Sequence, residues 1–261
     1  MSDYDTIRAA RDGDVLTIML DRPERLNAAP PLMFEEIGAA LKDLGGARAV
    51  LFTGNGRAFC SGADLAGRDD AGLDRAEATH RALSESYNPT MLAIAELAVP
   101  VVSAVRGPAA GIGCSLALAA DFCVASETGY FLQAFVNIGL VPDGGASWML
   151  PRLIGKARAM EMMLLGERIP AAQALSWGLI HKVVADDALD AEARALAERL
   201  AAGPTLAMAG IRRNLFRALD GDYPAALARE ADMQRDMARS DDAREGAIAF
   251  LQKRKAVFKG R

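Results

Sequence analysis

The alternation of apolar and polar positions divides the first half of the chain into strand-like and helix-like segments. Residues 15–20 and 47–54 are rich in β-branched and apolar side chains, which predicts two strands. Residues 30–44, between them, repeat apolar side chains at helical spacing with charges on one face, which predicts a helix. Residues 100–105 and 121–126 predict two further strands. The first half therefore has a β–α–β rhythm.

The segment between the last two predicted strands, residues 112–120, is so apolar that we expect a helix buried on nearly all sides. Later in the chain the pattern becomes mostly helical, with one short strand-like run at 179–184. Residues 201–207 are typical of a linker between two parts of a chain, and a charged helical stretch with an apolar stripe follows them. We therefore predict a core over residues 1–200 and a C-terminal helical oligomerisation region over residues 201–261.

Composition and charge narrow the class of protein. A chain of 261 residues that is 51% hydrophobic and 25% charged can bury a substantial core. The net charge is −4 and no dense run of Lys and Arg precedes the C-terminus, which argues against nucleic-acid binding. The first residues are polar and acidic, unlike a signal peptide, and Arg106, Gly107 and Pro108 interrupt the longest apolar stretch. We expect a cytoplasmic protein that binds no membrane.

The cysteines and histidines do not predict a metal site. Cys60, Cys114 and Cys123 lie among apolar or small residues without CxxC spacing, which indicates buried thiols and neither disulfides nor zinc. His80 and His181 are isolated, in settings typical of a surface helix and a strand end.

Two loop-to-helix junctions carry candidate chemistry. In GRAFCSGADL (56–65), small residues after a strand leave the amide of Ala63 without side-chain cover. In RGPAAGIGCSLALAA (106–120), a glycine-rich turn enters the apolar helix directly, so the first helical amides have no intrahelical acceptor. If the junctions converge, their donors could hold a carbonyl oxygen that becomes negative during a reaction. Taken alone, each junction is more typical of close packing than of catalysis.

A carboxylate in a third turn, LVPDGG (140–145), has two interpretations. Pro142 restricts the backbone before Asp143, and two glycines permit a sharp turn after it, so the turn could aim the carboxylate at a substrate. The same residues are also a good helix N-terminal signal, in which Asp143 would serve as a cap.

The order of these motifs resembles the crotonase (enoyl-CoA hydratase/isomerase) superfamily over nearly the whole chain. The resemblance rests on LDRPERLNA, GRAFCSGADL, AVRGPAAGIGCSLALAADF, LVPDGGASWMLPRLIG and GLIHKVV, and on EGAIAFLQKRKAVF, which is similar to the family's closing helix. It implies an α/β fold, a spiral of ββα units followed by a helical trimerisation region. It further implies an acyl-CoA thioester substrate, coenzyme A as part of that substrate with no other cofactor required, and a homotrimer or dimer of trimers.

Matched to the family motif by motif, the oxyanion-hole amides fall on Ala63 and Ile112. Family members often carry glycine at the second position, and a backbone donor survives its replacement by isoleucine. The implied coenzyme A contacts are Arg25, Leu26, Ala28, Ala63, Asp64, Leu65, Phe250 and Lys253. Asp64 is also a candidate cap for a helix after the first junction.

The catalytic acids are where the sequence departs from the hydratase pattern. Hydratases of this family carry two glutamates, and the matching positions here hold Ser115 and Phe135, which cannot orient and deprotonate water. The PDxG turn is similar to the ring-1,2-epoxyphenylacetyl-CoA isomerase and enoyl-CoA isomerase branch, which favours Asp143 as the acid/base. The predicted substrate pocket is Ser115, Phe131, Leu132, Phe135, Leu140 and Trp148. Its apolar members would desolvate Asp143 and raise its pKa. Ser115 could instead bond to the carbonyl one helical turn earlier.

Three functions stay open at this stage. The first is an acyl-CoA isomerase that uses Asp143, and the second a hydratase or hydrolase in which Asp143 activates water. The third is a non-catalytic protein that binds coenzyme A thioesters. The aromatic and apolar residues near Asp143 suggest a bulky or ring-bearing acyl group.

Overall fold

Two β-sheets form the framework of the fold in the computed structural model, which describes residues 4–65, 72 and 74–261. The larger sheet has the strand order β1-β2-β3-β4-β6-β9, with β1 and β2 antiparallel and the other neighbours parallel. The smaller sheet has the order β5-β7-β8. The strands are β1 (Ile7–Asp12), β2 (Val15–Leu20), β3 (Ala49–Gly54), β4 (Val101–Val105), β5 (Pro108–Ala110), β6 (Phe122–Ser126), β7 (Tyr130–Leu132), β8 (Ile169–Pro170) and β9 (Lys182–Val184).

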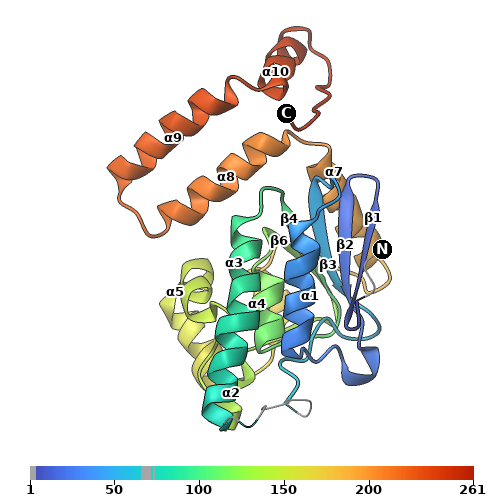
Figure 1. The fold of residues 1–261 in the computed structure, drawn as a ribbon, viewed down its shortest axis with the longest axis vertical. Coiled ribbons are helices and arrows are strands. Elements are labelled where there is room, and N and C mark those ends of the chain that lie inside the picture. The colour runs from blue at the N-terminus through green and yellow to red at the C-terminus, as the bar shows by residue number, and fades with distance from the viewer. Residues whose placement is uncertain (1–3, 66–71, 73) are drawn as a thin grey trace.

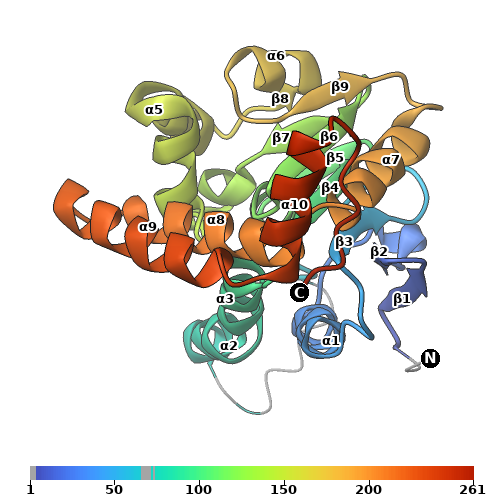
Figure 2. The same ribbon diagram turned by 90° about the horizontal axis from the view of Figure 1, so that it is seen from above.

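Helices cover both faces of the larger sheet. Figures 1 and 2 show α1 on one face and α7 on the other. The α-helices are α1 (Pro31–Lys42), α2 (Arg75–Ala82), α3 (Asn88–Glu96), α4 (Ile112–Leu118), α5 (Ala146–Leu165), α6 (Ala171–Ser176), α7 (Leu189–Ala201), α8 (Thr205–Ala218), α9 (Tyr223–Met237) and α10 (Asp241–Leu251). Shorter helical turns are η1 (Pro23–Arg25), η2 (Leu83–Tyr87) and η3 (Ala134–Ile138).

The spacing of apolar residues explains how α7 packs. Its buried residues recur at every fourth position, which places them on one face of the helix. That face packs against outward-facing residues of the sheet such as Val15, Leu51 and Val102. The opposite face of the sheet carries the main core, where Phe34 of α1 and Phe52 of β3 are fully buried. The sheet is therefore buried on both faces, as its continuous apolar strands require.

The predicted core elements are present, and the structure adds elements that the pattern did not reveal. The strands predicted at residues 15–20 and 121–126 correspond to β2 and β6, and the predicted buried helix corresponds to α4. Strand β1 was not predicted because its sequence, IRAARD, is polar and most of it is exposed. It pairs with β2 through a tight turn at Gly13, whose φ of +57° suits glycine.

The C-terminal helices stand apart from the sheets. In Figure 1, α8 and α9 form an antiparallel pair above the core, and α10 lies at the top. Arg48, just before β3, joins the core to this region by donating to Thr205 Oγ1 at 2.8 Å and to the Phe258 carbonyl at 3.1 Å. No helix in the described part of the chain is long and apolar enough to cross a membrane. The boundary between residues 200 and 201 stays a prediction.

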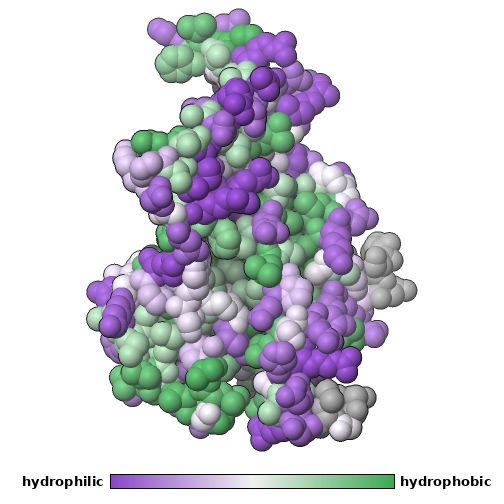
Figure 3. Space-filling model, turned by 60° about the vertical axis from the view of Figure 1, so that its left-hand side comes forward, coloured by the Kyte–Doolittle hydropathy of each residue, from purple (hydrophilic) through white to green (hydrophobic). Residues whose placement is uncertain are grey.

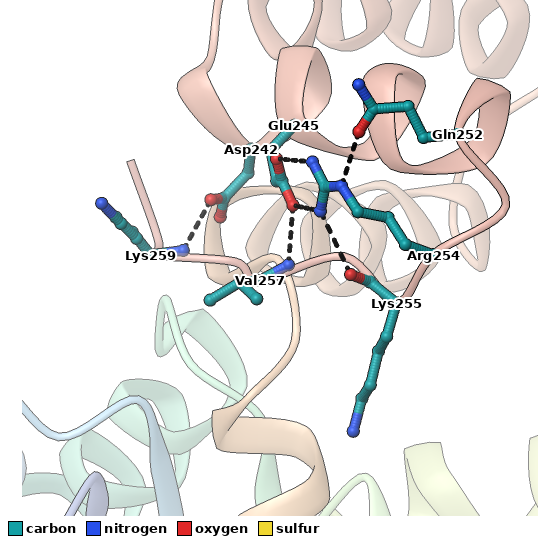
Figure 4. A network of polar contacts seen from close by, with 7 residues as sticks. All are labelled: Asp242, Glu245, Gln252, Arg254, Lys255, Val257 and Lys259. Carbon is teal, nitrogen blue, oxygen red and sulfur yellow. Dashed lines mark hydrogen bonds and ion pairs between the residues drawn. The ribbon is translucent and has the colours of Figure 1, made fainter.

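Two acidic residues of α10 hold the C-terminal tail (Figure 4). The carboxylate of Asp242, which is buried, accepts hydrogen bonds from the Lys259 amide at 2.6 Å and the Gly260 amide at 2.8 Å. Glu245 pairs with Arg254 at 2.6 Å and accepts from the Val257 amide at 2.9 Å. We call these contacts the tail clasp.

Candidate functional site

The two loop-to-helix junctions are joined through their backbones. The Cys60 amide donates to the Pro108 carbonyl at 3.0 Å, and the Ala110 amide donates to the Cys60 carbonyl at 2.9 Å. Nearby, the Phe59 amide donates to the Arg106 carbonyl at 2.7 Å. The loop after β3 and the loop after β4 therefore run side by side, as the sequence interpretation required for a shared site.

The two junctions lie in contact where the loops end. A Cβ atom on Gly111 would lie 3.7 Å from the Cα of Gly62, an ordinary van der Waals distance, and both residues have positive φ angles, +53° and +113°, which favour glycine. Ala63 and Ile112 directly follow these two glycines in the chain. The structure therefore brings the two predicted oxyanion-hole residues to one place.

The second junction holds the start of α4 in place and leaves the Ile112 amide without an intrahelical partner. The Gly111 amide donates to the Leu132 carbonyl at 2.8 Å. Ile112 is the first residue of α4, so its own amide has no intrahelical acceptor. Gly113 packs against Cys60, and a Cβ atom there would overlap the Cys60 side chain. The helix start is therefore held firmly against the first junction.

The predicted coenzyme A contacts near the N-terminus surround the first junction. The Ser61 amide donates to the Leu26 carbonyl at 3.0 Å, and the Asp64 amide donates to the Ala29 carbonyl at 3.0 Å. Arg25, Leu26 and Ala28 thus lie beside Ala63, with Arg25 exposed and the other two partly buried. Leu65 is 51% exposed.

Asp64 is held by a partner that the sequence analysis did not identify. Its buried carboxylate lies 2.8 Å from the guanidinium of Arg22, which belongs to the segment that precedes η1. A helix capped by Asp64 would extend into residues 66–71, which lie outside the described residues. The Arg22 contact ties the predicted coenzyme A segment to the first junction by charge as well as by backbone.

Phe250 and Lys253 lie elsewhere in the fold. Phe250 is in α10 and 84% exposed, and Lys253 follows α10 and is also exposed. Figure 1 places α10 beyond α8, apart from α1 and α4. Within one chain, these two residues and the first junction are therefore not neighbours.

The turn that carries Asp143 rests on α4. Gly144 lies so close to the helix that a Cβ atom there would overlap the Cδ1 methyl of Ile112 and lie 2.8 Å from the Cβ of Ser115. Ser115 donates its hydroxyl hydrogen to the Asp143 carbonyl oxygen at 3.0 Å. Helix α5 begins at Ala146 with Gly145 as its N-cap, so Asp143 lies two residues before the cap. The partly buried Asp143 is therefore a close neighbour of the second junction.

The predicted pocket residues surround this site unevenly. The ring of Phe135 packs on Gly111, 3.6 Å from where a Cβ atom would lie. Leu132 is partly buried next to it, whereas Phe131 is fully buried in the core. Leu140 is 42% exposed. Shielding of the site by apolar side chains is thus provided mainly by η3 and the end of β7.

Trp148 faces the C-terminal helices. Its ring lies 5.3 Å from that of Phe216 in α8, and the guanidinium of Arg152 stacks 4.3 Å from its centre. Asp220, after α8, pairs with Arg152 at 2.7 Å and accepts from the indole nitrogen at 3.2 Å. Trp148 therefore links α5 to α8.

An apolar groove of about 810 Å³ runs from the Asp143 turn to the C-terminal helices. Figure 3 shows apolar side chains around the hollow between these helices and the core. The lining includes Gly144 and Gly145 and a series of large apolar side chains from α3, α5 and α8. Those side chains are Met91, Leu92, Trp148, Met149, Leu153, Met208, Ile211, Leu215 and Phe216. The α8 members were not predicted from the sequence, because apolar residues on a charged helix are also typical of an oligomer contact.

The remaining candidate groups are structural. Cys60, Cys114 and Cys123 are buried free thiols, as predicted from their apolar surroundings, and burial raises the pKa of each to about 12. Asp121 accepts a hydrogen bond from the Val101 amide at 2.7 Å and pairs with Arg212 at 2.8 Å.

In the described ranges, no group of three His, Cys, Asp or Glu side chains could hold a metal ion.

Sequence comparisons link the chain to known proteins. The family model described as enoyl-CoA hydratase/isomerase matches residues 10–261. A Rhodobacter capsulatus protein named as a probable enoyl-CoA hydratase is 45% identical over 99% of both chains. The 1,2-epoxyphenylacetyl-CoA isomerase of Escherichia coli is 40% identical over 95% of both chains.

A structural comparison agrees with this similarity. The crystal structure of an enoyl-CoA hydratase from Polaromonas sp. JS666 superposes with a TM-score of 0.92 at 33% identity. The superposition covers 97% of this chain and 99% of the Polaromonas chain. The mixed α/β architecture with a helical C-terminal region is therefore shared between the two proteins.

Proposed function

Because the chain belongs to the enoyl-CoA hydratase/isomerase family, we propose that it is an acyl-CoA isomerase in which Asp143 is the acid/base. The observation that carries this proposal is the position of the Asp143 turn, which packs on Ile112 and Ser115 of α4 beside the second junction. The hydratases that this chain resembles carry two glutamates. Ser115 and Phe135 stand at the matching positions here, and neither side chain can replace a carboxylate.

The joined junctions would bind the thioester. The carbonyl oxygen would accept hydrogen bonds from the amides of Ala63 and Ile112, which follow the paired glycines Gly62 and Gly111. These donors interact more strongly with an enolate oxygen than with a neutral carbonyl, because the enolate carries the negative charge. One such donor typically contributes roughly 3–4 kcal/mol to the stability of the transition state.

Asp143 would move a proton between two carbons of the acyl group. In a 3-enoyl thioester, the double bond joins the third and fourth carbons of the acyl chain. The Asp143 carboxylate removes a proton from the second carbon, next to the thioester carbonyl, and the electron pair of that C–H bond passes into the enolate. The protonated Asp143 then gives the proton to the fourth carbon, while the enolate electrons form the new double bond between the second and third carbons. The carboxylate is restored and no atom is added to the substrate. A single base is therefore sufficient, and coenzyme A enters as part of the substrate with no further cofactor.

The apolar groove is our candidate for the acyl binding site. It reaches Gly144 and Gly145, so an acyl chain whose thioester lies at the junctions could pass Asp143 and enter it. Its volume of about 810 Å³ and its apolar lining suit a long or ring-bearing acyl group.

The coenzyme A moiety would lie along the segment that contains Arg25, Leu26, Ala28, Asp64 and Leu65. Phe250 and Lys253 cannot join them within one chain, because α10 lies beyond α8. We propose that they contact coenzyme A bound to a neighbouring copy, in a trimer or a dimer of trimers. The C-terminal helices, residues 201–261, would then form the oligomer contact.

Hydration is the second candidate function. It is favoured by the name of the Rhodobacter capsulatus relative. In that reaction Asp143 would activate a water molecule, and the oxygen of that water would be added to the acyl chain.

Turnover in heavy-oxygen water separates the two reactions. The protein is incubated with 3-enoyl-, 2-enoyl- and arylacetyl-derived CoA thioesters, and the products are followed by mass and absorbance. We expect the double bond to move with no gain in mass. Incorporation of heavy oxygen would establish hydration or hydrolysis and overturn the isomerase proposal.

A further inference from the structure

Ser115 connects α4 to the turn that carries Asp143. The side chain is fully buried, and its hydroxyl donates to the Asp143 carbonyl oxygen, 28 positions along the chain, at 3.0 Å. A serine in a buried helix more often bonds to the carbonyl one turn earlier in its own helix. We propose that Ser115 is a positioning residue, which holds the Asp143 carboxylate in place relative to the Ile112 amide. This inference rests on the proposed role of Asp143.

Helix α4 carries both the proposed oxyanion donor and the residue that holds the Asp143 turn. Ile112 and Ser115 are three residues apart, so they lie next to each other on the helix surface. Gly144 packs on this pair, and a Cβ atom there would overlap Ile112 Cδ1 and lie 2.8 Å from Ser115 Cβ. The oxyanion donor and the acid/base turn therefore share one support, which is how a precise site is built.

The hydrogen bond matters because Pro142 restricts the backbone only before Asp143, whereas the two residues after it are glycines. Gly144 and Gly145 have φ angles of +59° and +82°, and glycine restricts the backbone less than any other residue. The Asp143 carbonyl also accepts from the Ala146 amide at 3.1 Å, but that bond lies within the turn and would move with it. The Ser115 hydroxyl belongs to a different element, so it fixes the turn relative to α4.

The turn also packs closely against the Ser115 side chain. The Ser115 hydroxyl lies 3.0 Å from the Asp143 carbonyl oxygen, and a Cβ atom on Gly144 would lie 2.8 Å from the Ser115 Cβ. The proposed site is therefore built around one carboxylate, and the hydroxyl at position 115 orients the turn that carries it.

Ser103 provides a matched control for a test of Ser115. It is also fully buried, and its hydroxyl also donates to a backbone carbonyl, that of Ala117 in α4, at 2.8 Å. Ser103 is in β4 and its hydrogen bond does not involve the Asp143 turn. Replacing either serine by alanine removes one buried hydrogen bond to a carbonyl, so thermal unfolding should respond similarly in the two variants.

The kinetic experiment compares Ser115→Ala with Ser103→Ala on the thioester that the wild-type enzyme converts fastest. We expect Ser115→Ala to lower kcat roughly 10- to 100-fold with little change in KM, because a displaced base reacts poorly with a normally bound substrate. Ser103→Ala should keep the wild-type kcat. Ser115→Cys keeps a weak donor of similar size, and its kcat should lie between those of the wild type and Ser115→Ala.

A second readout does not depend on turnover. Carbon-13 NMR of the labelled aspartate carboxyl groups reports their surroundings, and the Asp143 resonance is identified by its loss in Asp143→Asn. We expect this resonance to shift in Ser115→Ala and to stay in place in Ser103→Ala.

These results separate the inference from the proposed function. If Asp143→Asn retains full turnover, the proposed function is wrong, and the NMR comparison alone decides whether Ser115 positions the carboxyl group. If Asp143→Asn is inactive while kcat or the Asp143 resonance is the same in the two serine variants, the role of Ser115 is wrong and the proposed function stands.

Discussion

The Asp143 turn and the tail clasp both involve an aspartate with little solvent access, but they are stabilised in opposite ways. At Asp143 the backbone is anchored, because its carbonyl accepts the hydroxyl of Ser115 at 3.0 Å. At Asp242 the carboxylate is itself the anchor, and it accepts from the Lys259 and Gly260 amides at 2.6 and 2.8 Å. A carboxylate that accepts hydrogen bonds from backbone amides has a structural role. An acid whose turn is anchored through its backbone can be presented to a substrate.

The surroundings of the two acids extend this difference. The Asp143 turn touches the start of α4 and opens to an apolar groove of about 810 Å³. The clasp lies at the far end of the molecule, where Asp242 is joined by Glu245 and Arg254 and the partners are backbone amides and charges (Figure 4). The Asp242 carboxylate therefore lies among the contacts that hold the tail, whereas the Asp143 turn lies beside the proposed oxyanion donor and the groove.

The largest expected effect that would test this comparison is on activity. Asp143→Asn should lower kcat/KM on the order of 10²- to 10⁴-fold, because the amide cannot accept and return a proton. Thermal unfolding should change little, since the backbone contact with Ser115 remains. Steady-state kinetics and a melting curve on the same sample measure both. Asp242→Asn serves as the matched control and should keep the wild-type kcat/KM. A similar loss of kcat/KM in Asp242→Asn would show that activity does not distinguish the two aspartates.

The second effect is on stability. Asp242→Ala should lower the free energy of unfolding by about 1–3 kcal/mol, because two backbone amides lose their buried acceptor. Denaturant unfolding measures the change, and limited proteolysis should cut the tail after residue 252 faster than in the wild type. The neighbouring Asp241, whose side chain is 52% exposed, is the control: it pairs with the exposed guanidinium groups of Arg244 and, at 3.4 Å, Arg261, so Asp241→Asn should have little effect. Equal losses in both variants would contradict a specific role for Asp242.

Much of the fold could be predicted from local patterns. Strands β2, β3, β4 and β6 are mostly apolar, because a sheet covered on both faces leaves few positions for polar side chains. The similarity of the ordered motifs to the enoyl-CoA hydratase/isomerase family is confirmed by the family model over residues 10–261. Strand β1 was missed because an edge strand with exposed, charged side chains has no apolar signature.

The site could be predicted only as a set of separate motifs. The sequence identified both glycine-rich junctions, but their approach at Gly62 and Gly111 depends on strands far apart in the chain being neighbours. Ser115 was predicted to line the substrate pocket, with a hydrogen bond within its own helix as the alternative, and the structure directs its hydroxyl to the Asp143 carbonyl. Apolar periodicity encodes which face of an element is buried. It does not encode the partner of a buried polar group.

The smallest expected effect concerns the other acid of the clasp. Hydrogen bonds from Arg254 and from the Val257 amide lower the pKa of Glu245 from 4.5 to about 2. The folded state therefore favours the charged form, so the contribution of Glu245 to stability is complete above pH 4.5 and is lost as the pH falls toward 2.

We expect the melting temperature of Glu245→Gln to lie about 1–2 °C below that of the wild type near neutral pH, since exposed ion pairs contribute little to stability. Melting curves across this pH range should show the difference shrinking as the wild-type carboxylate becomes protonated. Arg254→Gln, which removes the partner, should behave like Glu245→Gln near neutral pH, and a difference that persists at pH 2 would mean that the carboxylate charge is not what holds the tail.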